Sequence, residues 1–376
     1  MVQPGSRVLS ELVFHLSRSP HLIAPQEFSQ MEDHSVGTAG ILGFLDSYTS
    51  YLIIGHKEPD GDCIASQLVL ASYLGNKGKR TALLSAGPFT RTEIASYASR
   101  FEDKLPSWSS EPGVAAVILD CSSLSRTGPL GDAITQLMAT GLNVAIIDHH
   151  ASGETIAKDT DGRQAPSSPE LRYIDPSSPA VAFMVQGILE SASYKLDAEE
   201  AELLFFGLCT DTGFFRHLDA GSSVVFEAAG RLVASGASPK GAFEAMNGGK
   251  PFASRKLMGE LLSRAETSYD GRLIMTWMDL KDQERYGLVG RDSDMVYQLL
   301  MTVEGMEVAV VVRQESQTNC TVGFRSRKAV DVASIAASFG GGGHRLAAGL
   351  FIEGKVDDIL RRIQAAFAPV FGYQPR

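Results

Sequence analysis

The sequence predicts two α/β domains: a doubly wound, mainly parallel sheet, joined by a linker to a smaller domain with a mixed sheet. Strand-length apolar runs alternate with helical segments in the first part of the chain. The runs 114–119 and 144–147 are continuously apolar, as expected for parallel strands that are buried on both faces. The length of 376 residues is typical of about two domains.

The elements of the first domain follow from apolar runs and from turn and cap residues. Strands are expected at 51–55, 81–86, 114–119 and 144–147. A helix over 63–74 should end at Gly75, and a second should begin at Ser178-Pro179 and reach residue 189. Two more helices are expected at 199–208 and 222–234. The Gly/Pro/Ser-rich segment 151–170 is typical of an exposed loop, which could form a mobile rim beside a site.

The last third of the chain predicts the second domain. Strands are expected at 272–278, 307–313 and 321–325, and helices at 331–338 and 356–367. The residues 236–255 contain Gly, Pro and Lys and are interpreted as a connection. The predicted division is therefore an N-terminal extension over 1–37, a first domain over 38–236, a linker over 237–258 and a second domain over 259–372.

Composition excludes several classes of protein. The net charge is −10 and no block of like charge occurs, which argues against a duplex-DNA-binding surface. No signal sequence or membrane-length apolar run is found, so we expect a cytoplasmic protein without a membrane anchor. The four cysteines contain no C-x-x-C pair. Cys63, Cys121 and Cys209 lie near acidic residues, but we interpret them as small packing residues rather than zinc thiolates.

Four acidic motifs stand where apolar runs end. They are His56-x-x-x-Asp60-x-Asp62, Asp120, Asp148-His149-His150 and Asp211. Three of them follow predicted parallel strands, whose carboxyl ends meet at one edge of the sheet. The fourth follows a helix and must be brought in by packing. An aspartate after a strand can also be a simple turn or helix-cap residue, but three consecutive polar groups after a buried strand are costly to bury unpaired.

Together the four motifs predict a metal site. Crowded carboxylates repel one another and favour binding of cations between them. Mixed imidazole and carboxylate ligands suit Mn²⁺, Fe²⁺, Co²⁺ or Zn²⁺ better than Ca²⁺. Two metal ions that share one carboxylate can activate a hydroxide between them and neutralise charge on phosphoryl oxygens. The predicted chemistry is therefore hydrolysis of a phosphoester.

These motifs resemble those of the DHH phosphoesterase superfamily, whose name describes the triplet found here at 148–150. The stretch Gly-Phe-Arg325-Ser326, followed by Gly-Gly-Gly-Gly-His344-x-x-Ala-Ala-Gly349, resembles the DHHA1 domain associated with it. The resemblance covers residues 40–372 and is greatest to the nano-RNase branch, which hydrolyses oligoribonucleotides and 3′-phosphoadenosine 5′-phosphate (pAp). It implies an active site in the cleft between the two domains.

The resemblance also implies a role for each matching residue. His56 and Asp60 would bind the first metal, Asp62, His149 and Asp211 the second, and Asp120 would bridge both. His150 would contact the scissile phosphate, and Asp148 would orient a histidine. The implied cofactors are two divalent ions, with Mn²⁺ as first choice and Mg²⁺, Co²⁺ or Fe²⁺ as alternatives.

The implied substrate contacts lie mainly in the second domain. Arg325 and Ser326 would bind a non-scissile phosphate, for which the guanidinium fork is well suited. The backbone of Gly341, Gly342 and Gly343, with His344 beside it, would approach an anion closely. In the first domain, Arg126 is a further candidate phosphate contact, although it could also be an ordinary surface arginine.

The expected substrates are short single-stranded RNA of two to five residues, the linear dinucleotide pApA, and pAp. Neither the preferred substrate nor the cleavage polarity can be read from the sequence, and a homodimer is an expectation from the resemblance alone. One alternative is a family II inorganic pyrophosphatase, because Ser326-Arg327-Lys328 is similar to a motif of that family. The other is a nucleotide-binding regulator without catalytic activity.

Overall fold

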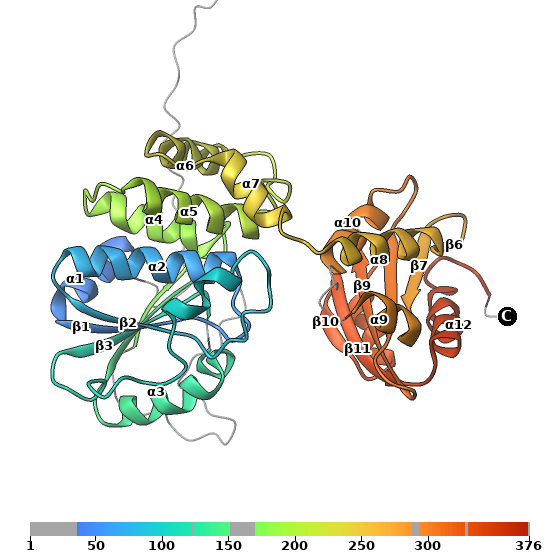
Figure 1. Ribbon diagram of the computed structural model, residues 1–376, viewed down its shortest axis with the longest axis horizontal. Coiled ribbons are helices and arrows are strands. Elements are labelled where there is room, and N and C mark those ends of the chain that lie inside the picture. Colours follow the sequence, from blue (N-terminus) through green and yellow to red (C-terminus); the bar gives the residue numbers. More distant parts are fainter. Residues whose placement is uncertain (1–35, 122, 151–169, 288–292, 328–329, 375–376) are drawn as a thin grey trace, which may run out of the picture. The chain divides into compact units, whose positions relative to one another are not determined.

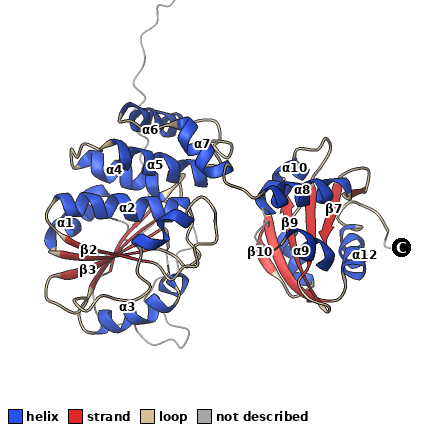
Figure 2. Ribbon diagram, viewed as in Figure 1, coloured by secondary structure: helices blue, strands red, loops and turns tan. Residues whose placement is uncertain are grey.

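The computed structural model describes residues 36–121, 123–150, 170–287, 293–327 and 330–374. The extension 1–35, nearly all of the loop expected at 151–170, and Lys328 lie outside these residues. Within them the chain forms two α/β domains, each with its own sheet (Figures 1 and 2). The predicted fold class is confirmed.

The first domain contains a five-stranded sheet in which every neighbouring pair is parallel. Its order is β2-β1-β3-β4-β5. The strands are β1 (Ser50–Ile54), β2 (Arg80–Leu84), β3 (Val114–Leu119), β4 (Asn143–Asp148) and β5 (Glu170–Ile174). The direction of strand addition reverses between β1 and β3, which is the switch point where doubly wound sheets bind ligands.

Helices cover both faces of this sheet. One face packs on a core that includes α1, α2, α4 and α5, and the other packs on α3 (Figure 1). The helices are α1 (Thr38–Ser47), α2 (Gly61–Asn76), α3 (Pro129–Ala139), α4 (Val181–Ser191), α5 (Ala198–Asp211), α6 (Ser223–Ala234) and α7 (Pro239–Asn247), with short 3-10 turns η1 (Ala95–Arg100) and η2 (Leu124–Thr127). Because both faces are covered, the central strands are apolar throughout.

Several predicted boundaries in this domain differ from the observed ones, including the end of α5, which was expected at residue 208 and lies at Asp211. Helix α2 passes through Gly75 and ends at Asn76. A helix commonly ends near a residue with a left-handed backbone, and here that residue is Gly78 (φ 74°) rather than Gly75. The Lys79 N–H then donates to the Leu74 carbonyl. Helix α4 begins at Val181 rather than at Ser178-Pro179, because the Asp62 carboxylate accepts the first N–H groups of this helix.

The expected connection 236–255 contains helical segments. Ser238 caps α7 through the Gly241 N–H, and Pro239 occupies the first helical position. Helix α8 (Phe252–Ser263) begins five residues after α7 ends. Only residues 248–251 therefore separate the two helices, and the predicted linker 237–258 is mostly helical.

The second domain contains a six-stranded mixed sheet of order β10-β11-β9-β8-β7-β6. Its strands are β6 (Glu266–Ser268), β7 (Leu273–Met278), β8 (Val308–Gln314), β9 (Asn319–Ser326), β10 (Gly342–His344) and β11 (Ala347–Glu353). Only β7 and β8 are parallel. Its remaining helices are α9 (Leu280–Tyr286), α10 (Ser293–Met301), α11 (Val332–Ser338) and α12 (Val356–Phe367).

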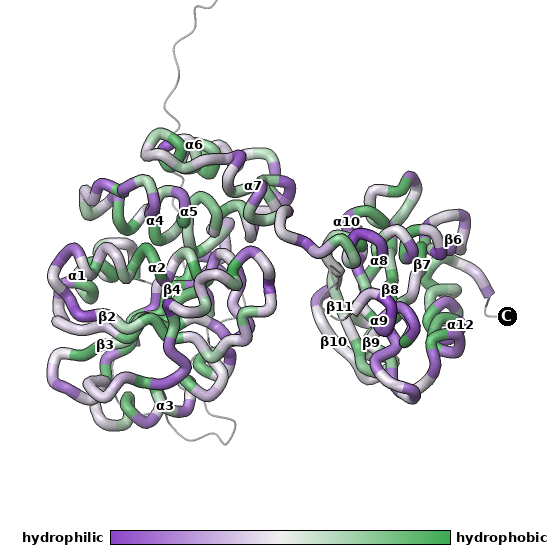
Figure 3. Tube along the Cα trace, viewed as in Figure 1, coloured by the Kyte–Doolittle hydropathy of each residue, from purple (hydrophilic) through white to green (hydrophobic). Residues whose placement is uncertain are grey.

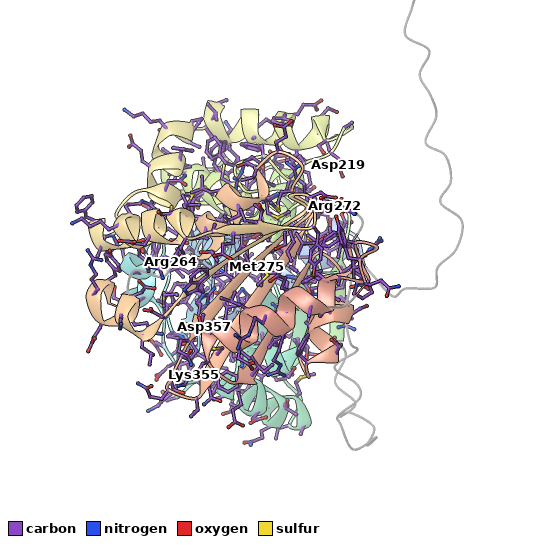
Figure 4. The ribbon with its side chains drawn as sticks, turned by 90° about the vertical axis from the view of Figure 1, so that its right-hand side faces the viewer. Asp219, Arg264, Arg272, Met275, Lys355 and Asp357 are labelled. Carbon is purple, nitrogen blue, oxygen red and sulfur yellow. The ribbon has the colours of Figure 1, made fainter. Side chains whose placement is uncertain are left out.

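The second sheet is also packed on both faces. Helices α8 and α10 contribute to one core, and α11 and α12 to the other. Figure 4 labels Met275 on the buried strand β7 and Lys355 and Asp357 at the start of α12. Hydrophobic colour follows the strands of both domains in Figure 3. Among the described residues, no helix is long and apolar enough to cross a bilayer.

Candidate metal centre

The switch point of the first sheet places three of the predicted motifs together. His56 follows β1, Asp120 follows β3, and Asp148 is the last residue of β4. Asp120 has a left-handed backbone (φ 58°), and its N–H donates to the Ile147 carbonyl of β4 (3.0 Å). Aspartate tolerates this conformation better than most residues, and such strain is often found at ligand-binding positions.

Asp60 and Asp62 are held at the start of α2. The Asp60 carboxylate accepts the Cys63 N–H (3.1 Å) and is the N-cap of this helix. Asp62 is completely buried, and its two carboxylate oxygens accept the N–H groups of Val181 (2.6 Å) and Ala182 (2.7 Å). Asp62 therefore caps α4 from a distant part of the chain, which explains why that helix begins at Val181.

The fourth motif is brought in by close packing of helices. Asp211 is the last residue of α5. A Cβ atom at Gly207, one turn earlier, would lie 2.9 Å from the Ala182 Cβ and 3.0 Å from the Ala65 Cβ. The absence of a side chain at Gly207 thus lets α5 approach α2 and α4, and this approach carries Asp211 to the cluster.

The close approach at Gly207 gives a testable prediction. Gly207→Ala should destabilise the protein by about 1–3 kcal/mol, because the added methyl group overpacks this junction. The same substitution at Gly230, a helical glycine with open space around it, should instead stabilise by about 0.5–1 kcal/mol. Denaturant unfolding of both variants measures the difference, and equal effects at the two positions would contradict the packing argument.

The converging side chains surround Asp120. Its Oδ2 lies 3.4 Å from the His56 Nε2, and its Oδ1 lies 3.6 Å from the His149 Nε2. The His149 Nε2 is also 3.1 Å from the Asp211 Oδ2, and the His56 Nε2 is 3.9 Å from the Asp60 Oδ1. Each oxygen of Asp120 therefore faces a different histidine, and each histidine faces a further carboxylate.

Hydrogen bonds orient the three histidines. The Nδ1 atoms of His56 and His149 contact the backbone carbonyls of Lys57 (2.7 Å) and Ser178 (3.1 Å). Because a carbonyl only accepts, Nδ1 carries a proton in both histidines, so Nε2 is the ring atom that can offer a lone pair to a metal ion. The Nδ1 of His150 lies 2.7 Å from the Asp148 Oδ1. Asp148 thus orients His150, the role that the resemblance implied.

The charges of the cluster are not balanced by protein groups. Burial, with Asp211 and Asp120 nearby, raises the pKa of Asp62 well above its usual range. Burial likewise raises the pKa of Asp120 to about 6, despite the His56 hydrogen bond that lowers it. Burial opposes the charged form of His149, but Asp211, Asp120 and Asp62 outweigh it and raise its pKa to about 9.

Asp60 differs from the other two carboxylates, whereas His56 resembles His149. Burial would raise the pKa of Asp60, but His56, the Cys63 N–H and the charge of Arg91 lower it to about 2. Burial would lower the pKa of His56, but Asp120 and Asp60 raise it above its usual range. Without a cation the cluster holds protons between its carboxylates and imidazoles, which is the behaviour of an anionic site that a metal ion can neutralise.

The donor atoms fit divalent metal ions. Among the described residues, the buried Asp120 Oδ1 and His149 Nε2 have no hydrogen-bond partner. Such buried polar atoms are costly unless a ligand satisfies them. Donor atoms lie within 4.8 Å of one another in three groups: His56, Cys63 and Asp120; Asp120, His149 and His150; and Asp62, His149 and Asp211.

Cys63 and His150 were not predicted as ligands. Burial raises the pKa of the Cys63 thiol to about 12, and its Sγ lies 3.5 Å from the Gln67 Oε1. A protonated thiol is a poor metal ligand, which supports a packing role for Cys63.

A cavity of about 420 Å³ opens over this cluster. It is lined by Lys57, Glu58 and Arg91 and by seven of the predicted residues, which are His56, Asp60, Asp120, Arg126, His149, His150 and Asp211. Sequence reasoning missed Lys57, Glu58 and Arg91. A signal for Arg91 existed, because the loop after β2 also opens at the carboxyl edge of the parallel sheet.

In the second domain, Arg325 and His344 share a sheet face. Ala347 of β11 pairs with Arg325 on one side and with His344 on the other. Cross-strand partners point to the same face. Gly342 and Gly323 belong to this face too, since they lie two residues away along their strands. The face carries a cation beside small residues, as expected for an anion-binding surface.

Part of the glycine run forms a strand. Gly342–His344 form β10, and a Cβ atom at Gly343 would lie 2.6 Å from the Ala348 Cα. A Cβ atom at Gly341 would lie 2.4 Å from the Leu350 Cβ, whereas Gly342 has open space. Packing therefore explains two of the glycines, whereas Gly342 is exposed with open space around it. Ser326 is nearly buried, and its Oγ has no hydrogen-bond partner among the described residues.

Tyr297 of α10 was also missed, and it positions Arg325. The Arg325 guanidinium lies over the Tyr297 ring, 4.8 Å from its centroid, and a Cβ atom at Gly323 would lie 2.2 Å from the Tyr297 hydroxyl. Tyr297 is only 5% exposed. The ring thus fills the space above Gly323 and supports the guanidinium from one side.

This contact predicts that Tyr297→Leu raises KM for a phosphorylated substrate about fivefold, because a cation–π contact contributes about 1 kcal/mol. The value of kcat should change little. Tyr297→Phe, which keeps the ring, should leave KM within about twofold. Steady-state kinetics on pApA would measure both, and an equal rise in the two variants would assign the effect to the hydroxyl.

A doubly wound sheet with clustered carboxylates and imidazoles at its switch point defines an α/β protein with a candidate metal centre. Two family models match the chain: the DHH family N-terminal domain over residues 50–208, and the DHHA1 domain over residues 276–368. The protein belongs to the DHH family of phosphoesterases.

Several relatives support this assignment. The bifunctional oligoribonuclease and PAP phosphatase NrnA of Thermus thermophilus is 30% identical over 84% of this chain and 88% of its own length. The protein of that name from Bacillus subtilis is 23% identical over 82% and 91%. The cyclic-di-AMP phosphodiesterase PdeA of Listeria monocytogenes is 27% identical, but over only 43% of its own length.

A solved structure agrees with the fold. An exopolyphosphatase-related protein from Bacteroides fragilis has a TM-score of 0.72, with 18% identity, over 89% of this chain and 97% of that one. The named relatives are phosphodiesterases and phosphatases, so this protein is a hydrolase. The family is metal-dependent, which agrees with the donor groups described above.

Proposed function

We propose that the protein hydrolyses phosphoester bonds in short nucleotides: oligoribonucleotides of two to five residues, pApA or pAp. The observation that carries this proposal is the position of Asp120, whose two oxygens face the two halves of the donor cluster. A shared carboxylate between two donor sets is the arrangement that a two-metal phosphoesterase requires. The names of the NrnA relatives support the substrate class.

His56 and Asp60 would hold one divalent ion, and Asp62, His149 and Asp211 a second, with Asp120 shared between them. Mn²⁺ is our first choice for this mixed donor set. Bound there, the ions would neutralise phosphoryl charge and lower the pKa of a water molecule.

Residues of the protein would orient the histidines and bind the substrate. Asp148 holds the His150 ring in place to face a phosphoryl oxygen, and the Ser178 carbonyl orients the His149 ring so that its Nε2 faces the carboxylates. Arg325, the Ser326 hydroxyl, the accessible Gly342 backbone and His344 would bind a non-scissile phosphate. The cleft between the domains stays a prediction from the resemblance.

The first test is nucleotide release from pApA with Mn²⁺, comparing the unmodified protein with His149→Ala and Arg325→Ala and assaying pAp and pyrophosphate in parallel. We expect pApA turnover that both substitutions reduce strongly, with little cleavage of pyrophosphate. Fast pyrophosphate hydrolysis would favour the pyrophosphatase alternative. Stoichiometric binding of pApA without turnover would favour the regulator, and turnover that survives His149→Ala would place the metal site elsewhere.

A further inference from the structure

Three basic side chains surround the mouth of the acidic cavity. Lys57 follows His56, Arg126 belongs to η2, and Arg91 belongs to the loop after β2; all three are exposed and line the cavity. Glu58 is the acidic residue among the exposed lining groups, so the mouth carries net positive charge above the buried carboxylates. An anion that enters the cavity must pass these groups.

Arg91 differs from most other arginines of this domain. Arg80, Arg172 and Arg231 pair with carboxylates at 3.3, 3.0 and 2.8 Å. In the part of the chain that the structure describes, the Arg91 side chain makes no hydrogen bond and no ion pair, although its charge acts on Asp60. An arginine beside an acidic cluster that is not paired within it is available to bind an anion from solution.

The backbone that carries Arg91 is anchored on both sides. Phe89 packs on Phe101 with ring centroids 5.4 Å apart, and Ile94 is fully buried and donates its N–H to the Arg91 carbonyl (3.2 Å). Glu93 forms a largely buried ion pair with Lys250 (3.0 Å). The Cα of Arg91 is therefore fixed, and the guanidinium is presented to the cavity from a defined position.

The place of Arg91 within the cavity indicates which phosphate it meets. The scissile phosphate must reach the buried donor atoms of Asp120 and His149 at the bottom. Arg91 also lines this cavity, but its side chain is exposed and, among the described residues, forms no ion pair with Asp60. A further phosphate of the same strand would lie nearer the mouth.

We propose that Arg91 is a specificity-determining residue that binds the phosphate on the 3′ side of the scissile one, which pApApA has when its first internucleotide bond is cleaved and which pApA lacks. This inference rests on the proposed function and deepens it, because it gives the metal domain its own contact with the strand. Lys57 and Arg126 complete the cationic mouth. The protein should therefore bind pApApA more tightly than pApA, and the difference should depend on Arg91.

The test compares steady-state hydrolysis of pApA and pApApA by the full-length Mn²⁺-loaded protein and by Arg91→Gln. We expect KM for pApApA to rise about tenfold, the usual effect of losing one charge-assisted hydrogen bond, with kcat unchanged. KM for pApA should stay within about twofold. The slope of log KM against log salt for pApApA should fall in magnitude by about 0.7, as for one lost contact to a single strand.

Two further variants are the controls. Arg91→Lys keeps the charge and should recover part of the affinity for pApApA. Arg100→Gln changes an exposed arginine of η1 that does not line the cavity and should leave both substrates unchanged. An equal loss on both substrates with Arg91→Gln would show that Arg91 serves the scissile phosphate or the fold, and no loss on either would also overturn the inference. Absence of pApA cleavage by the unmodified protein would instead contradict the proposed function.

Discussion

Asp120→Asn is expected to reduce Mn²⁺-dependent hydrolysis by about 10³-fold or more, since transition-state charge stabilisation by bound metal contributes several kcal/mol. The substitution preserves shape but removes the negative charge that faces both His56 and His149. It also places an amide nitrogen, which cannot ligate a cation, on one side of the cluster. One change should therefore weaken both halves of the site.

Initial rates on pApA, together with calorimetric titration of Mn²⁺, would check this expectation. Asp132→Asn is the matched control, because Asp132 is an exposed aspartate in the first turn of α3 and does not line the cavity. It should leave rate and metal stoichiometry unchanged. Retention of more than a tenth of the rate by Asp120→Asn would show that this residue does not bridge the two donor sets.

Metal binding is also expected to raise thermal stability by a large amount. A ligand at about 100 times its Kd stabilises the folded state by about 2.7 kcal/mol per site. Two such sites would contribute about 5 kcal/mol, which corresponds to a rise in Tm on the order of 10 °C for a domain of this size. The physical cause is the relief of repulsion among Asp62, Asp120 and Asp211 and the satisfaction of the buried His149 Nε2.

Thermal scans of chelator-treated and Mn²⁺-saturated protein measure this shift. His149→Ala removes a donor of the second metal. In this variant, Mn²⁺ should raise Tm by only about half as much as in the unmodified protein. Replacing Mn²⁺ by excess Na⁺ at equal ionic strength controls for general screening. A Tm that is the same with and without Mn²⁺ would contradict strong metal binding in this cluster.

The sequence alone determined most of the first domain and its chemistry. The continuous apolar run 114–119 matches β3 residue for residue. A strand that is buried on both faces is apolar at every position, so the bounds of the strand are those of the apolar run. The metal-site residues were predictable because the ends of parallel strands meet at one edge. No such rule applies to Asp211, which follows a helix and reaches the cluster only through packing.

Only the tertiary structure decided how that cluster is assembled. Helix α4 begins where the Asp62 carboxylate accepts two N–H groups, and a partner 119 residues away in the chain leaves no local cap signal at Val181. Gly207 has no distinguishing feature in the sequence, and its role follows from the close packing of its backbone against Ala65 and Ala182. Arg91 and Tyr297 carry no motif, and their roles depend on a cavity and a ring contact that exist only after the chain has folded. Local spacing determines which residues can bind a metal, but contacts between residues distant in the sequence decide what surrounds them.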